Sequence, residues 1–208
     1  MDNNGAVYVA DRFNNLIQVF TNTGAFITQW GSSGTGDGQL NQPASVAVDK
    51  NLNVFVVDHL NNRIQKFTNT GTFLAKWGGL GFGPGQFDLP ESVAVDGSGN
   101  VFVADDGSRV QKFTTDGVFL AEWGSPGTGD GQFNQAIGVA VDANGNVFVS
   151  DFDNRVQKVR VPVRRRRSLS RPVRESSSDR CGPLAGTFRR APAGLVGVRV
   201  LYRLPMCP

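Results

Sequence analysis

The feature that most constrains the fold is a repeat of 46 to 47 residues that runs through the first three quarters of the chain. The string Val-Ala-Val-Asp begins at residues 46, 93 and 139. Three more landmarks share this spacing, and one of them is a Trp-Gly pair that recurs at Trp30, Trp77 and Trp123. A regular period of this length is typical of repeat proteins in which each copy is one supersecondary unit.

Each repeat contains four short runs of β-branched and aromatic residues, separated by Gly, Asn, Asp and Pro, which predicts four strands. We call them a (SVAVD), b (NVFVAD), c (RIQKF) and d (FLAEWG). Strands a and b are almost continuously apolar, as in a sheet covered on both faces. Strand d alternates, for example Leu74 and Lys76 between Phe73, Ala75 and Trp77, which favours an outer edge with a polar rim. In the first repeat we expect strands near residues 6–10, 16–21 and 25–30.

The turn between strands a and b reads Asp142-Ala143-Asn144-Gly145-Asn146 in its last copy. Asp can accept hydrogen bonds from the turn's own N–H groups, and Gly tolerates the positive φ of a hairpin. A calcium loop would need Gly at the position of Val147 and Glu at the position of Asp153. The pattern therefore predicts a plain hairpin turn and no metal site.

The repeat P-x-S-V-A-V-D-x-x-G-N-V-F-V-A-D-x-x-N-N-R-I-Q-K-F-T-x-x-G-x-F-L resembles the NHL repeat. This resemblance covers residues 5 to 159 and implies a β-propeller, mostly six-bladed in that family and of the TolB-like group. None of the three Trp residues is followed by Asp, so the WD repeat is excluded. We therefore predict an all-β propeller built from NHL-type four-stranded blades.

The number of strands predicts an incomplete ring of about 3.5 blades. The first repeat has strands b, c and d, two repeats are complete, and the last has a, b and c, which makes 14 strands. Six such blades would occupy roughly 280 residues. We expect an open arc whose bare edges could self-associate. The predicted repeats lie at about 1–42, 43–89, 90–135 and 136–159.

The composition changes after Val159. Residues 1–159 carry 9 Lys and Arg against 16 Asp and Glu, a net charge of −7, whereas residues 160–208 carry 12 Arg against Glu175 and Asp179, a net charge of +10. Three interpretations of this Arg- and Pro-rich tail stay open: a segment that binds phosphates, a disordered linker, or a coding frame lost just after Lys158. The third interpretation is favoured because Val159 stands where the repeat has Phe. A nucleic-acid partner is therefore expected only if the tail is genuine.

Membrane and targeting signals are not evident in the sequence. The longest apolar stretches have the length of strands, so we expect no membrane span. The start Met1-Asp2-Asn3-Asn4 lacks the basic and apolar regions of a signal peptide. Both cysteines, Cys181 and Cys207, lie in the tail and decide no redox compartment. The localisation is left open.

The resemblance also implies that an enzymatic function is possible, because some NHL-like propellers are lyases that use histidine-bound metal or a histidine base. This chain has one histidine, His59, which excludes a multi-histidine metal site, and a lone loop histidine is ordinarily solvated. There is no Gly-x-Ser-x-Gly motif and no phosphate-binding loop. We predict no catalytic residue, no metal ligand and no cofactor. A fragment of a lyase- or lactonase-type enzyme remains the alternative.

Binding of a protein or peptide is the function that the sequence favours. Positions shared by all copies must serve turns and packing, whereas positions that differ between copies are free to serve a ligand. The b-to-c loops differ most, and together with the d-to-a loops they are expected on one face. Exposed apolar residues there favour a partner, although they could also fold back onto a neighbouring loop. RNA binding, known for some NHL proteins, ranks third because the repeats are acidic. The predicted binding residues are Arg12, Phe13, His59, Leu60, Asp106, Phe152 and Asp153.

Overall fold

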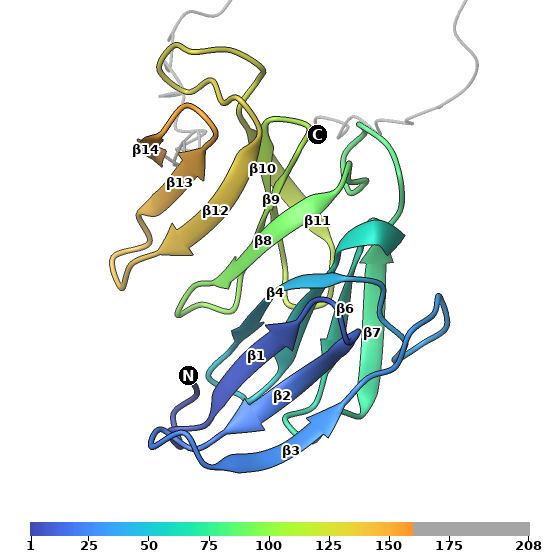
Figure 1. The fold of residues 1–208 in the computed structure, drawn as a ribbon. Helices are drawn as coiled ribbons and strands as arrows, with labels where there is room; N and C mark the ends of the chain where they lie inside the picture. The colour runs from blue at the N-terminus through green and yellow to red at the C-terminus, as the bar shows by residue number, and fades with distance from the viewer. Residues whose placement is uncertain (160–208) are drawn as a thin grey trace, which may run out of the picture. The chain divides into compact units, whose positions relative to one another are not determined.

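The structure, a computed structural model, describes residues 1–159, and this part of the chain is all-β (Figure 1). The predictions made for residues 160–208 lie outside the described residues. Most strands begin and end within one or two residues of the predicted positions. The strands are β1 (Val7–Asp11), β2 (Leu16–Phe20), β3 (Phe26–Trp30), β4 (Pro43–Val48), β5 (Val54–Asp58), β6 (Arg63–Phe67), β7 (Phe73–Gly78), β8 (Pro90–Val95), β9 (Val101–Asp105), β10 (Arg109–Phe113), β11 (Phe119–Trp123), β12 (Ala136–Val141), β13 (Val147–Asp151) and β14 (Arg155–Val159).

The strands form four antiparallel sheets that follow one another along the chain, from blue to orange in Figure 1. Sheet 1 is β1-β2-β3, sheet 2 is β4-β5-β6-β7, sheet 3 is β8-β9-β10-β11, and sheet 4 is β12-β13-β14. In sheets 2 and 3 these strands are the predicted a, b, c and d in order. Sheet 1 has b, c and d, and sheet 4 has a, b and c. The incomplete set of four-stranded units is therefore confirmed.

Successive sheets meet along their first strands. β4 lies beside β8, and β8 lies beside β12. The Ser45 hydroxyl accepts a hydrogen bond from the Val93 amide at 3.2 Å, and the Ser92 hydroxyl accepts one from the Val139 amide at 3.2 Å. The a-strands are thereby linked to one another, while the d-strands lie on the far side of each sheet.

The apolar cores lie between neighbouring sheets. One of them joins Phe55 and Ile64 of sheet 2 to Val101 and Phe113 of sheet 3, and equivalent clusters lie on either side of it. The tryptophans of strand d pack against these cores from the outer side. Trp77, for example, lies against the ring of Phe113 in the next sheet, with ring centroids 6.0 Å apart.

The a-to-b turns are hairpins held by their aspartates. Asp142 Oδ1 accepts hydrogen bonds from the backbone amides of Asn144 and Asn146 at 2.9 and 2.8 Å. The b-to-c loop of sheet 2 contains a short 3₁₀ helix, η1 (His59–Asn61), which the sequence does not predict. No helix among residues 1–159 has the length and apolar character needed to cross a membrane.

Candidate binding site

The residues shared between repeats hold the loops in place. Arg63, the first residue of β6, donates from Nε to Asp58 at 2.6 Å and from its two Nη atoms to carbonyls of the preceding d-to-a loop. Arg109 and Arg155 bind Asp105 and Asp151 in the same way, at 3.1 and 2.8 Å. These buried or half-buried pairs connect the b-to-c loops of sheets 2, 3 and 4 to the d-to-a loops that precede those sheets. The shared positions therefore serve the fold.

Backbone hydrogen bonds bring the two kinds of loop together on one face. The amide of Leu60 donates to the carbonyl of Asn41 at 3.1 Å, and the amide of Phe152 donates to that of Asn134 at 2.9 Å. We call this surface the loop face. It consists of the b-to-c loops at 12–15, 59–62, 106–108 and 152–154 and the d-to-a loops at 31–42, 79–89 and 124–135.

A group of charged side chains from three repeats meets at the loop face. Glu91, at the start of β8, lies 3.4 Å from Arg12 Nη1 through one carboxylate oxygen and 3.4 Å from His59 Nδ1 through the other. His59 Nδ1 also lies 3.0 Å from the carbonyl oxygen of Pro90. A carbonyl only accepts hydrogen bonds, so this geometry assigns a proton to Nδ1.

Asp106 belongs to the same group. Burial raises the pKa of its carboxyl group, and the nearby negative charge of Glu91 raises it further, whereas His59 and Arg12 act in the opposite direction. We call Arg12, His59, Glu91 and Asp106 the charged cluster. The structure therefore brings together three of the predicted residues, Arg12, His59 and Asp106, with Glu91, which the sequence reasoning missed.

His59 corrects one expectation. A lone loop histidine was expected in solvent, but only 5% of His59 is exposed. The residue opens η1, and its ring turns toward Pro90 and Glu91 of the next sheet. The b-to-c loop of sheet 2 is one residue longer than that of sheet 3, which provides the extra backbone for this short helical turn.

The predicted apolar residues lie at the surface and do not fold back under their loops. Phe13 is 85% exposed, Phe152 is 58% exposed and Leu60 is 41% exposed. Leu80 and Phe82, each 70% exposed, add to them from the d-to-a loop that follows sheet 2. Their equivalents in the other two copies are Ser, Pro or Thr, so the same comparison of copies that selected the b-to-c loops could have found them.

Asp153 has a different environment. Its Oδ1 accepts a hydrogen bond from the side-chain amide of Asn134 at 2.9 Å, and its Oδ2 lies 3.7 Å from Arg155 Nη2. These contacts tie the last b-to-c loop to its d-to-a loop. Nothing in them brings Asp153 to the charged cluster.

The loop face offers both ionisable and apolar side chains. Within residues 1–159, no three or more His, Cys, Asp or Glu side chains are grouped so that they could hold a metal ion. The charged cluster offers one imidazole, one guanidinium and two carboxylates, and exposed apolar side chains project from loops of the same face. Such a mixture of charge and apolar surface suits recognition of a polypeptide.

A family model described as a 6-bladed beta-propeller, DUF5128, matches residues 1–64. No curated protein matches the chain. Solved structures support the same architecture over a longer stretch. The described chain has the β-propeller fold.

Three of these structures illustrate the range of proteins that share this fold. Virginiamycin B lyase from Staphylococcus aureus matches with a TM-score of 0.55 and 13% identity, over 79% of this chain and 55% of that one. A protein of unknown function from Bacteroides caccae matches with a TM-score of 0.52 and 17% identity, over 74% and 53%. Hydrazine synthase from Kuenenia stuttgartiensis matches with a TM-score of 0.54 and 10% identity, over 76% and 47%. The chain spans about half the length of these structures, and at such identities the likeness establishes the fold alone.

Proposed function

We propose that residues 1–159 are an NHL-type propeller segment that acts as a scaffold and binds a protein or peptide through the loop face. The observation that carries this proposal is the exposure of Phe13, Leu60, Leu80, Phe82 and Phe152 on loops whose shared residues already satisfy the fold. Exposed aromatic side chains are typical of surfaces that a partner covers.

The charges at the loop face suggest the kind of partner. Glu91 and Asp106, with Asp88 close enough to raise the pKa of Asp106, provide more negative than positive charge beside Arg12 and His59. Residues 1–159 as a whole carry a net charge of −7. We therefore propose a partner segment that combines an apolar anchor with Lys or Arg. Complementary charges speed the association of the segment with the loop face and fix its position there.

Selection of peptides from a random displayed library on the full chain tests this proposal. Peptides that bind should be enriched in aromatic or aliphatic residues next to Lys or Arg. They should lose most of their affinity for a variant carrying Phe13→Ser, Leu60→Ser and Phe152→Ser. Truncating an anchor residue at an interface typically weakens binding by more than about 1 kcal/mol, which is about fivefold or more.

A matched control replaces exposed leucines outside the loop face. Leu74 in β7 and Leu120 in β11 are 46% and 45% exposed, and they lie on strand d. The variant with Leu74→Ser and Leu120→Ser should bind the selected peptides as the unmodified chain does. Equal losses in both variants, or no loss in the loop variant, would contradict the proposal.

An enzymatic function is the second candidate, favoured by the contact between buried His59 and Glu91. A similar solved structure is a catalytically inactive histidine-to-alanine variant of virginiamycin B lyase with quinupristin. Incubation of the full chain with quinupristin, followed by mass spectrometry, separates the two candidates. Turnover that is lost in His59→Ala would favour the enzyme, whereas intact quinupristin would speak against a lyase of this substrate class.

For the segment after Val159, which lies outside the described residues, we propose that the coding frame was lost after Lys158. The repeat has Phe67 and Phe113 at the position of Val159. Reading the DNA downstream of the Lys158 codon in all three frames tests this directly. One shifted frame should encode Phe, then a turn with Gly, then a strand that ends in Trp-Gly, and the absence of these landmarks would refute frame loss.

A further inference from the structure

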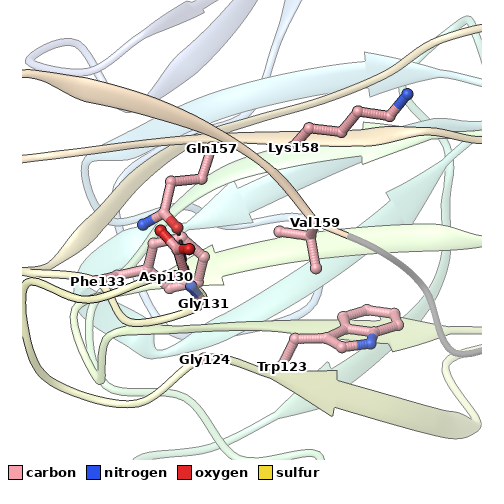
Figure 2. Close-up of a pocket in the computed structure, with 8 residues that line it drawn as sticks. All are labelled: Trp123, Gly124, Asp130, Gly131, Phe133, Gln157, Lys158 and Val159. Atoms are coloured by element: carbon pink, nitrogen blue, oxygen red, sulfur yellow. Dashed lines mark hydrogen bonds between the residues drawn. The ribbon is translucent and has the colours of Figure 1, made fainter.

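The outer side of sheet 4 carries an open groove of about 380 Å³ between β11 and β14. Figure 2 shows Trp123 and Val159 in one part of it, and Asp130, Phe133 and Gln157 in another. Within residues 1–159, no strand pairs with β14 on the side away from β13. An exposed strand edge of this kind can hydrogen-bond an added strand.

The complete sheets show what fills the equivalent space. In sheet 2, β7 pairs with β6 so that Phe73 lies opposite Phe67 and Lys76 lies opposite Gln65. The ring of Phe73 packs against that of Phe67, which in turn lies 4.5 Å from the indole of Trp30 in sheet 1. The indole of strand d therefore packs against an aromatic ring on strand c of the next sheet, and a second aromatic ring, on strand d of that sheet, packs against the first. Next to Trp123, the strand-c position that holds an aromatic residue in sheets 2 and 3 is occupied by Val159.

The groove also carries a negative charge, and the equivalent charge beside sheet 2 forms an ion pair. Asp37, in the d-to-a loop that precedes sheet 2, forms an ion pair of 2.6 Å with Lys76 of β7. Asp130 is the equivalent residue in the loop that precedes sheet 4. That loop is held in the same way, since the amide of Gly131 donates to Gln157 Oε1 at 2.9 Å and that of Gly38 donates to Gln65 at 3.0 Å.

Sheet 3 supplies the converse case. Its strand d has Glu122 at the position of Lys76, and the loop that faces it has Pro84 where the other two copies have Asp. Glu122 instead lies 3.3 Å from Arg109. The aspartate at this loop position therefore accompanies a cation on strand d, so Asp130 indicates that the strand suited to sheet 4 carries Lys or Arg opposite Gln157.

The chain's own continuation does not have this chemistry. Counted from the repeat, Val163 stands at the position of Gly117 and Arg165 at the position of Phe119. Gly117 has a φ of +81°, and a Cβ atom there would lie 2.7 Å from the indole of Trp77. A β-branched residue at the equivalent position would be strained and would collide with Trp123.

We propose that the groove beside Trp123 binds an extended segment of another polypeptide, which adds to β14 as an antiparallel strand. The segment has an aromatic residue opposite Val159 and Lys or Arg three residues later, opposite Gln157 and near Asp130. The aromatic ring packs beside Val159, as Phe73 packs against Phe67, and the cation pairs with Asp130. This inference rests on the groove between β11 of sheet 3 and β14 of sheet 4, and it does not depend on the function proposed for the loop face.

A synthetic peptide with the sequence of residues 68–78 (TNTGTFLAKWG) is the probe, and its matched control carries Lys76→Glu. Binding to the full chain is measured by isothermal titration calorimetry, and hydrogen exchange locates it on the sequence. The unmodified chain should prefer the lysine peptide by about fivefold, which is the size expected when a partly exposed ion pair is replaced by repulsion. Binding should slow amide exchange in β14.

The decisive arm is the charge reversal Asp130→Lys. Asp130 is exposed, so this variant keeps the packing of sheet 4, and it should prefer the glutamate peptide instead. The proposal is overturned if neither peptide binds, or if the preference stays the same in Asp130→Lys. It is also overturned if β14 is already protected from exchange in the chain alone, either as a monomer or in a dimer found by sedimentation, because the groove would then have another occupant.

Discussion

Substitutions in the turns between strands c and d can measure how much the packing between neighbouring sheets contributes to the free energy of unfolding. Gly24 in sheet 1 and Gly71 in sheet 2 occupy the same turn, with φ of +86° and +88° and an amide that donates to a threonine carbonyl at 3.0 and 3.1 Å. Their surroundings differ. A Cβ atom at Gly71 would lie 2.3 Å from Cγ of Trp30, whereas one at Gly24 would meet no atom within 4 Å.

The expected costs follow from these two environments. A non-glycine residue in the left-handed region costs roughly 1 to 2 kcal/mol, and Gly24→Ala should reduce the free energy of unfolding by about that much. Gly71→Ala has the same backbone cost, and it also forces Trp30 to move. Because Trp30 lies 4.5 Å from the ring of Phe67, it has little room, and overpacking of this kind costs about 1 to 3 kcal/mol more.

Urea unfolding of the full chain, followed by circular dichroism, measures both variants. The background variant Trp30→Ala completes a double-mutant cycle. In that background, Gly71→Ala should cost no more than Gly24→Ala does in the unmodified chain, because the clash has been removed. Equal costs for the two glycines in the unmodified chain, or an extra cost at Gly71 that survives Trp30→Ala, would refute the assignment of this tryptophan to the contact between sheets.

Three other predictions concern single residues. Trp77→Ala should cost on the order of 3 kcal/mol in thermal or urea unfolding. Trp77→Phe should cost much less, because the indole N–H is buried without a hydrogen-bond partner among residues 1–159. Arg63→Ala should cost about 3 to 5 kcal/mol, because it leaves the carboxylate of Asp58 buried without its cation, and a loss below about 1 kcal/mol would show that the pair is dispensable. Burial raises the pKa of Asp105 from 3.8 to about 6, so the folded chain binds this proton more tightly than the unfolded chain does. The free energy of unfolding should therefore fall, on the order of 2 kcal/mol, as the pH rises from about 4 to about 6, and this slope should disappear in Asp105→Asn.

The strands could be predicted from the sequence because each pattern occurs three or four times in the chain. Val54–Asp58 is a run of five residues that the structure buries completely, and its copies have nearly the same residues at the same spacing. A misassigned boundary in one repeat would have conflicted with the other copies of the same strand. The 3₁₀ helix at His59–Asn61 has no such support, since it occurs in one copy only.

The charged cluster could be predicted only in part, because the sequence does not show how the sheets are arranged. Arg12 and Glu91 are 79 residues apart, and they meet because the first strands of successive sheets lie side by side. Comparison of copies selected Arg12, His59 and Asp106 because they lie in loops. Glu91, whose equivalents are Ala44 and Ile137, is the second residue of β8, and the sequence does not show that this end of the strand lies beside Arg12 and His59.

The arrangement of Asp58 and Arg63 explains why variation at the loop face costs the fold so little. The carboxylate of Asp58 holds Arg63, and Arg63 holds three carbonyls of the neighbouring loop, so the backbone of both loops is fixed by residues that are the same in the complete repeats. Side chains such as Leu60 and Phe82 then project from a backbone that does not depend on them. A chain built in this way can change what its loops present without changing how its sheets pack. The differences between its copies are therefore better evidence of binding than the residues the copies share.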